Sequence, residues 1–146
     1  MNNEQRFFFD IGLQYYASAR FAAFGHFAPI SGNLFHHSVE MLLKGGLVST
    51  VSVNDLKKLG HALPKLWKRF KGQFPDPDLA THNQLIARLD CFESIRYPDA
   101  IVSGGAVCAI HLKRSHVPAS ALVSPRGAAP LYDLVVEEMD ELKNVL

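Results

Sequence analysis

The sequence has few of the features that assign a chain to a common functional class. Its two cysteines, Cys91 and Cys108, lie far apart and form no C-x-x-C pair, so we expect reduced thiols in a cytoplasmic protein. No apolar run reaches about 18 residues without charges, and the first residues lack the basic-then-apolar order of a signal peptide. We therefore expect neither a membrane span nor a secretion signal.

The sequence also lacks a large net charge and the common cofactor-binding motifs. The formal net charge is only +1, so the chain as a whole has no electrostatic attraction to nucleic acid or to anionic lipid. The sequence contains no G-x-S-x-G, P-loop or dinucleotide-binding motif. Apart from His36 and Glu40, it contains no cluster of His, Cys, Asp and Glu with metal-ligand spacing. We expect no metal and no cofactor.

The sequence does have helical periodicity and enough apolar residues for a core. Because 48% of its 146 residues are hydrophobic, we expect one domain that covers residues 1–146. The spacing of the apolar residues predicts an all-α fold, an up-and-down bundle of four to five helices. The expected helices cover 3–25, the segment from a cap at Ser31 or Asn33 to Gly45-Gly46, 61–73, 77–97 and 131–146, with a short helical turn within 55–60.

Residues 99–130 break this pattern. They are rich in glycine, proline and alanine and have no helical period, so we expect a long irregular insert before the last helix. Residues 100–103 and 106–112, on either side of Gly104-Gly105, could pair as a short β-hairpin.

The second expected helix carries a polar stripe beside its apolar face. His36, Glu40 and Lys44 follow one another at intervals of four, so their side chains stack along the helix. A hydrogen-bonded network between helices is the favoured interpretation. A general base or a metal ligand is the alternative, because His and Glu four residues apart can chelate. We expect His37 to be a half-exposed packing residue.

Arg96 is a permanent cation on an apolar helix face. Because an unpaired buried guanidinium is costly, it requires a carboxylate, a helix C-terminus or a bound anion. The ordinary interpretation is an ion pair with Glu40, Glu93 or the acidic last helix. The functional one is a contact to a phosphate or nucleotide, with Tyr97 and Asp99 beside it.

One basic cluster also stands out, with Trp67 and Phe70 among its members. Its cations are Lys57, Lys58, Lys65, Lys68, Arg69 and Lys71. A solvated helix face is the ordinary interpretation. Binding of RNA or a partner is the alternative, because basic residues follow phosphates. The acidic last helix could meet this cluster within or between chains. Spare aromatic surface on the first helix could be covered by a partner chain.

Three segments together resemble the HEPN family of helical domains: His-Ser-Val-Glu-Met-Leu-Leu-Lys-Gly at 37–45, Gly-His-Ala-Leu-Pro-Lys-Leu-Trp at 60–67 and Ile-Arg-Tyr-Pro-Asp at 95–99. The resemblance covers most of residues 21–146. It implies a bundle of four or five helices that is usually dimeric. Members of the family bind nucleotides, act as metal-independent ribonucleases, or partner a nucleotidyltransferase in toxin–antitoxin pairs.

The ribonuclease branch of that family carries Arg, a polar residue and then His after four to six positions. Here no histidine follows Arg96 until His111, so we expect a non-catalytic protein that binds a nucleotide or other phosphate ligand. The expected ligand-binding residues are Arg96, Tyr97, Asp99, His36, Glu40 and Lys44, with Lys65, Lys68 and Arg69 as a basic patch. One alternative is a ribonuclease in which His36 or His61 supplies acid–base chemistry. The other is a purely structural partner subunit.

Overall fold

The computed structural model describes residues 1–96, 107–111 and 131–146, and there the chain folds as an α-helical bundle, as predicted. Its α-helices are α1 (Asn3–Phe24), α2 (Ala28–Leu47), α3 (Val53–Leu59), α4 (Leu63–Gln73), α5 (Asn83–Cys91) and α7 (Val136–Val145). The 3-10 helices η1 (Pro77–His82) and η2 (Phe92–Arg96) precede and follow α5. Strands β1 (Val107–His111) and β2 (Leu131–Val135) form a small parallel sheet. No helix in the described ranges is long and apolar enough to cross a membrane.

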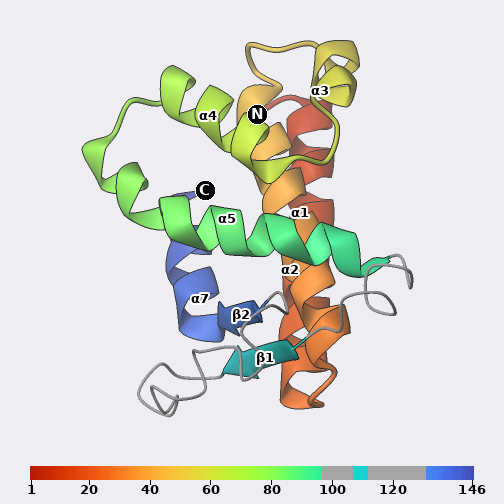
Figure 1. The fold of residues 1–146 in the computed structure, drawn as a ribbon. Coiled ribbons are helices and arrows are strands. Elements are labelled where there is room, and N and C mark those ends of the chain that lie inside the picture. The colour runs from red at the N-terminus through yellow and green to blue at the C-terminus, as the bar shows by residue number, and fades with distance from the viewer. Residues whose placement is uncertain (97–106, 112–130) are drawn as a thin grey trace.

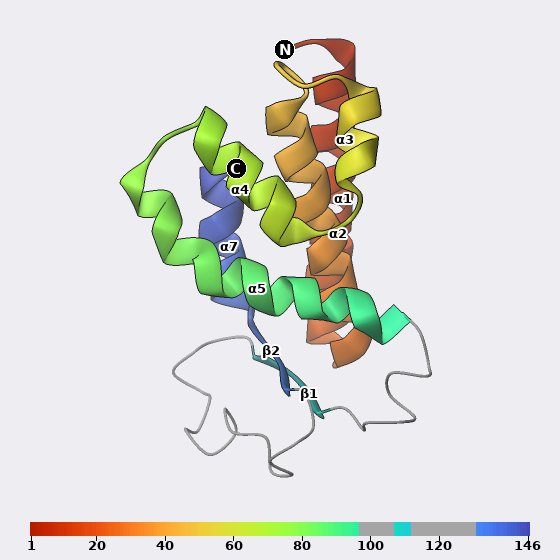
Figure 2. The ribbon, with the colours of Figure 1, turned by 45° about the horizontal axis from the view of Figure 1, so that its top comes forward.

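The helices are arranged around α2. Figure 1 shows α1 and α2 side by side as a long antiparallel pair, with α4 leading away from it and α5 returning across it. Figure 2, turned by 45°, shows α7 on the same side of the pair as α4 and α5. Helix α2 contacts α1, α4, α5 and η2, so it is the central helix of the bundle. Its apolar face, Phe35, Val39, Leu42 and Leu43, is buried.

The predicted end of the second helix at Gly45-Gly46 is wrong. Helix α2 continues through both glycines to Leu47. Their role is close packing: a Cβ at Gly45 would lie 3.0 Å from the ring of Phe9, and one at Gly46 would lie 2.7 Å from the ring of Phe70. The glycines therefore let α1 and α4 approach the backbone of α2, and this packing outweighs the poor helix propensity of glycine.

The predicted start of the last helix at residue 131 is also wrong. Residues Leu131–Val135 form β2, which pairs with β1 in parallel so that Val107 lies opposite Leu131. Hydrogen bonding to a distant strand overrides the helical spacing of the apolar residues. Helix α7 begins at Val136, with Glu137 and Glu138 in its first turn, where negative charge is favourable. The expected hairpin arm at 100–103 lies outside the described residues.

The segment predicted as one helix over 77–97 consists of η1, α5 and η2 in succession. Its predicted start is confirmed, since the Asp76 side chain caps η1 by accepting from the backbone N of Asp78 at 2.9 Å. Phe92, in η2, packs directly on α2, because a Cβ added at Gly32 would lie only 2.0 Å from the Phe92 ring. In addition, Asn33 Nδ2 donates to the Phe92 carbonyl at 3.3 Å, so η2 is held against α2.

Two ion pairs attach the acidic helix α7 to its neighbours. Asp140 accepts from Arg20 Nη1 on α1 at 2.6 Å, and Glu138 accepts from Arg88 on α5. Within the chain, these two acidic side chains therefore meet arginines of α1 and α5. A contact between chains that joins α7 to the basic cluster of α3 and α4 stays a prediction.

Candidate functional site

The polar stripe of α2 lies inside the bundle. His36 and Glu40 have no exposed surface, and only 7% of the surface of Lys44 is exposed. Each side chain must therefore find its partners within the protein. The arrangement fits the favoured interpretation of a network between helices.

Glu40 is the centre of this network. Its carboxylate accepts from Lys44 Nζ at 2.6 Å, from His61 Nδ1 at 3.0 Å and from His37 Nδ1 at 3.3 Å. Burial by itself would raise the pKa of Glu40, but the hydrogen bonds from His37, Lys44 and His61 outweigh it and lower the pKa to about 2. Glu40 is therefore ionised at neutral pH, and its negative charge balances that of Lys44.

His61 connects this network to the surface. Its Nδ1 lies against the buried carboxylate of Glu40, while 60% of its side chain is exposed. An ionised carboxylate only accepts hydrogen bonds, so Nδ1 of His61 is the donor and Nε2 is the ring nitrogen left for another partner. A histidine oriented in this way by a carboxylate can transfer protons to a ligand.

His36 has a different environment. Its Nδ1 donates to the Leu89 carbonyl of α5 at 3.1 Å, and its Nε2, which has no hydrogen-bond partner, faces Glu93 Oε2 of η2 at 3.5 Å. Burial is the main cause that lowers the pKa of His36, and this favours the neutral ring. The neutral ring has its proton on Nδ1 and a lone pair on Nε2.

The Arg96 part of the expected site can be followed only in part. The backbone of Arg96 closes η2 as a helical residue, as expected, but its side chain and residues Tyr97 and Asp99 lie outside the described residues. Their contact with a phosphate stays a prediction. Glu40, one of the expected partners of Arg96, accepts from Lys44 and both nearby histidines.

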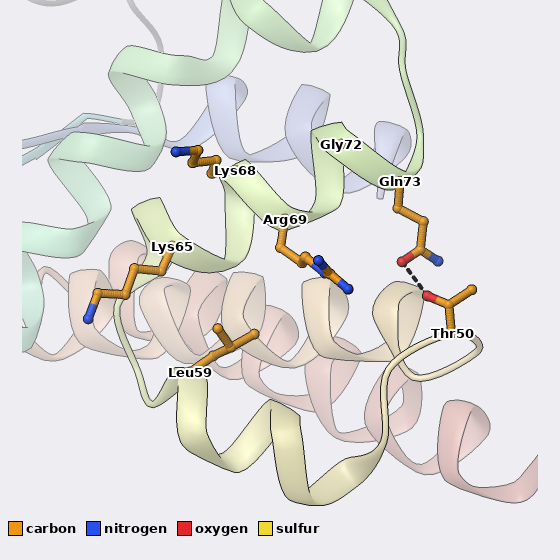
Figure 3. Close-up of a pocket in the computed structure, with 7 residues that line it drawn as sticks. All are labelled: Thr50, Leu59, Lys65, Lys68, Arg69, Gly72 and Gln73. Carbon is orange, nitrogen blue, oxygen red and sulfur yellow. Dashed lines mark hydrogen bonds between the residues drawn. The ribbon is translucent and has the colours of Figure 1, made fainter.

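The basic patch borders a pocket of about 590 Å³. Figure 3 shows this pocket between α4, the end of α3 and the turn after α2, with Arg69 reaching toward Thr50 and Gln73. The pocket is lined by Thr50, Leu59, Lys65, Lys68, Arg69, Gly72 and Gln73. At its far end, the Thr50 hydroxyl donates to Gln73 Oε1.

The three cations of this pocket have no acidic partner in the described part of the chain. Lys65, Lys68 and Arg69 are exposed and form no ion pair there, whereas Lys58 of the same basic cluster pairs with Asp55 at 2.7 Å. Three positive charges within about one turn of α4 create a positive potential at the pocket. Such a surface attracts anions.

The aromatic members of the cluster lie on the opposite face of α4. Trp67 and Phe70 are buried, and Trp67 Nε1 donates to Asn83 Oδ1 at 2.8 Å. They are core residues, and they cannot stack on bases. The pocket therefore offers charge and hydrogen bonds to a ligand, with Leu59 as its apolar wall.

Two features of the site were not visible in the sequence. The approach of His61 to Glu40 joins residues 21 positions apart, and the approach of Glu93 to His36 joins two separate helices. Neither contact follows a helical spacing, so only the packing of α2 against its neighbours reveals it.

Comparison of the chain with protein families, curated proteins and solved structures found no match.

Proposed function

We propose that the protein binds the phosphates of a nucleotide, either free or within single-stranded RNA, in the basic pocket of α4. The observation that carries this proposal is that Lys65, Lys68 and Arg69 line one pocket without a carboxylate partner in the described residues. Its volume of about 590 Å³ is within the range of small-molecule sites. The resemblance to HEPN domains supports the same ligand class.

The chemistry of the lining residues suits a phosphate group. The Arg69 guanidinium can donate two parallel hydrogen bonds to phosphate oxygens, and the two lysines add mobile charges along the same face. The hydroxyl of Thr50 and the amide of Gln73 can contact a sugar or base edge beyond the phosphate. The aliphatic wall at Leu59 provides limited apolar contact, so charge accounts for most of the affinity.

This proposal places the ligand away from the polar stripe of α2. Lys44 and Glu40 neutralise each other inside the bundle, so the stripe has little net charge to offer a phosphate. Its function is to hold α2 against the segment that precedes α4. Phosphate binding by Arg96, Tyr97 and Asp99 is a separate prediction.

Titration of a fluorescein-labelled single-stranded oligouridine, followed by polarisation, tests the proposal. We expect Arg69→Ala and Lys68→Ala each to weaken binding by about fivefold or more, because each removes a charge-assisted contact. Lys57→Ala is the matched control, since it removes an exposed lysine of the same cluster that does not line the pocket. Unlabelled ATP should displace the RNA. Binding that Lys57→Ala and Arg69→Ala weaken equally, or no binding of either ligand, would refute the proposal.

We also propose that the protein forms a homodimer. This dimer acts either by itself or in a complex with a nucleotidyltransferase or a toxin–antitoxin partner protein. Large apolar side chains are exposed around the turn from α1 to α2: Phe21, Phe24, Phe27 and Ile30. Phe21 is 84% exposed, and apolar patches of this kind commonly mark protein interfaces. A second copy of the chain could cover this patch, beside the Arg20 guanidinium that lies 5.8 Å from the centre of the Phe24 ring.

A ribonuclease remains a second candidate function because of one contact. The Glu40 carboxylate orients His61, whose other ring nitrogen can act as a base at the surface. In this case His61→Ala would abolish cleavage of single-stranded RNA in the presence of EDTA while the protein remained folded. Absence of cleavage by the wild-type protein would leave the binding function alone.

A further inference from the structure

We propose that His36, His37 and Glu93 form a binding site for a divalent transition-metal ion, with zinc as the preferred metal. One ring nitrogen of each histidine and one carboxylate oxygen of Glu93 lie within 4.8 Å of one another. This site is distinct from the basic pocket of α4 and does not depend on the proposed nucleotide binding.

The contact between His36 and Glu93 is the strongest indication of a cation. Nε2 of His36 faces a carboxylate oxygen at 3.5 Å without a hydrogen bond, although the His36 side chain is fully buried. Because Nδ1 donates to the Leu89 carbonyl, Nε2 is the ring nitrogen of His36 that is left for a metal ion. A metal ion between Nε2 and the Glu93 oxygen would form a coordinate bond with each.

The spacing of these atoms suits coordination. Two ligands of a tetrahedral zinc ion with bonds near 2.0–2.1 Å are about 3.4 Å apart. The observed 3.5 Å between His36 Nε2 and Glu93 Oε2 is close to this value. The ligand atom of His37 lies within 4.8 Å of the other two, so it has to approach them by at most about 1.4 Å to reach the same spacing.

Both histidines also have the supporting hydrogen bonds that metal ligands require. Metal-binding histidines usually donate their second ring N–H to a carbonyl or carboxylate, which fixes the ring and raises its basicity. The Leu89 carbonyl serves this purpose for His36 at 3.1 Å, and the Glu40 carboxylate does so for His37 at 3.3 Å. Glu40 thus orients His37, and the hydrogen bond from Lys44 helps to keep the Glu40 carboxylate ionised.

The donor set and its exposure indicate an open site. Two histidines and one carboxylate leave at least one coordination position for water, as in catalytic zinc sites. His36 is buried, whereas the side chains of His37 and Glu93 are 17% and 29% exposed, so water and ions can reach the site. The sequence did not predict it, because Glu93 reaches α2 only when η2 packs on Gly32.

Calorimetric titration of the chelator-treated full-length chain with Zn²⁺ tests this site. We expect one Zn²⁺ per chain, with affinity weakened at least tenfold in Glu93→Gln and in His37→Gln. The control is Glu141→Gln, an exposed acidic residue of α7, which should bind as the wild type does. His36→Ala is avoided because it would leave a cavity in the core.

Cobalt substitution provides a second readout that a purely structural effect would not reproduce. Co²⁺ in a tetrahedral or five-coordinate nitrogen–oxygen site has visible absorption bands much stronger than those of hydrated Co²⁺. We expect these bands in the wild type and in Glu141→Gln and their loss in Glu93→Gln. Absence of stoichiometric Zn²⁺ binding to the wild type, or equal binding by Glu93→Gln, would overturn the proposal.

Discussion

Replacing Glu40 with Gln removes the negative charge at the centre of the buried network and leaves Lys44 without its counter-ion. The pKa of Glu40 falls from 4.5 to about 2 on folding, a difference of about 2.5 units. At about 1.4 kcal/mol per pKa unit this corresponds to roughly 3–4 kcal/mol of the free energy of unfolding near neutral pH. Loss of one partner of a buried ion pair commonly costs a similar amount, about 3–5 kcal/mol.

The pH dependence follows from the direction of that shift. A group whose pKa is lowered in the folded state stabilises the fold above its unfolded pKa, and the stabilisation is lost as the pH falls toward the folded pKa. The contribution of Glu40 should therefore be present above pH 4.5 and disappear as the pH falls to about 2. The Glu40→Gln variant should lack this part of the acid unfolding curve.

Urea denaturation and thermal unfolding at pH 7, both followed by circular dichroism, measure the effect. We expect Glu40→Gln to lower the free energy of unfolding by about 3 kcal/mol, or the Tm by roughly 6–12 °C for a chain of this size. Asp55→Asn, which removes an exposed partner of Lys58, should leave the Tm unchanged. Addition of Lys44→Met to Glu40→Gln should recover part of the loss. A Glu40→Gln protein as stable as the wild type would refute the reasoning.

Three further outcomes are expected. Gly32→Ala places a Cβ 2.0 Å from the Phe92 ring and should cost about 2 kcal/mol or more in a urea titration; an unchanged midpoint would contradict the close packing of η2 on α2. Phe21→Ser should shift the protein from dimer to monomer in size-exclusion chromatography with light scattering, with its helical circular dichroism unchanged; a wild-type monomer would disprove the proposed interface. Asp140→Asn should cost only about 1 kcal/mol, because its pair with Arg20 is partly exposed, and a much larger loss would show that the pair is better shielded than its exposure indicates.

The sequence predicted the features that depend on local spacing. Val39 and Leu43 are four residues apart, so they share a face in any helix, and both are buried as expected. Pro64 in the first turn of α4 and the Asp76 cap of η1 also follow from local chemistry. These properties need no knowledge of distant parts of the chain.

The features that were missed depend on partners far away in the sequence. Gly45-Gly46 resembles a helix stop until the rings of Phe9 and Phe70 are seen against it. The segment Leu131–Val135 has helical spacing, yet it is a strand because β1 is available for pairing. The same holds for the site. The polar stripe of α2 was evident from the sequence, but the contact of Glu40 with His61 forms only when the segment before α4 packs on α2.

The most direct measurement of the central claim, that the cations of α4 bind phosphates, is the salt dependence of RNA affinity. Each phosphate contact to a single strand contributes about −0.7 to the slope of log K against log salt, so three contacts predict a slope of about −2. We expect a slope of about −1.4 for Arg69→Ala and an unchanged slope for Lys57→Ala. A wild-type affinity that does not vary with salt, or identical slopes for all three proteins, would contradict the account.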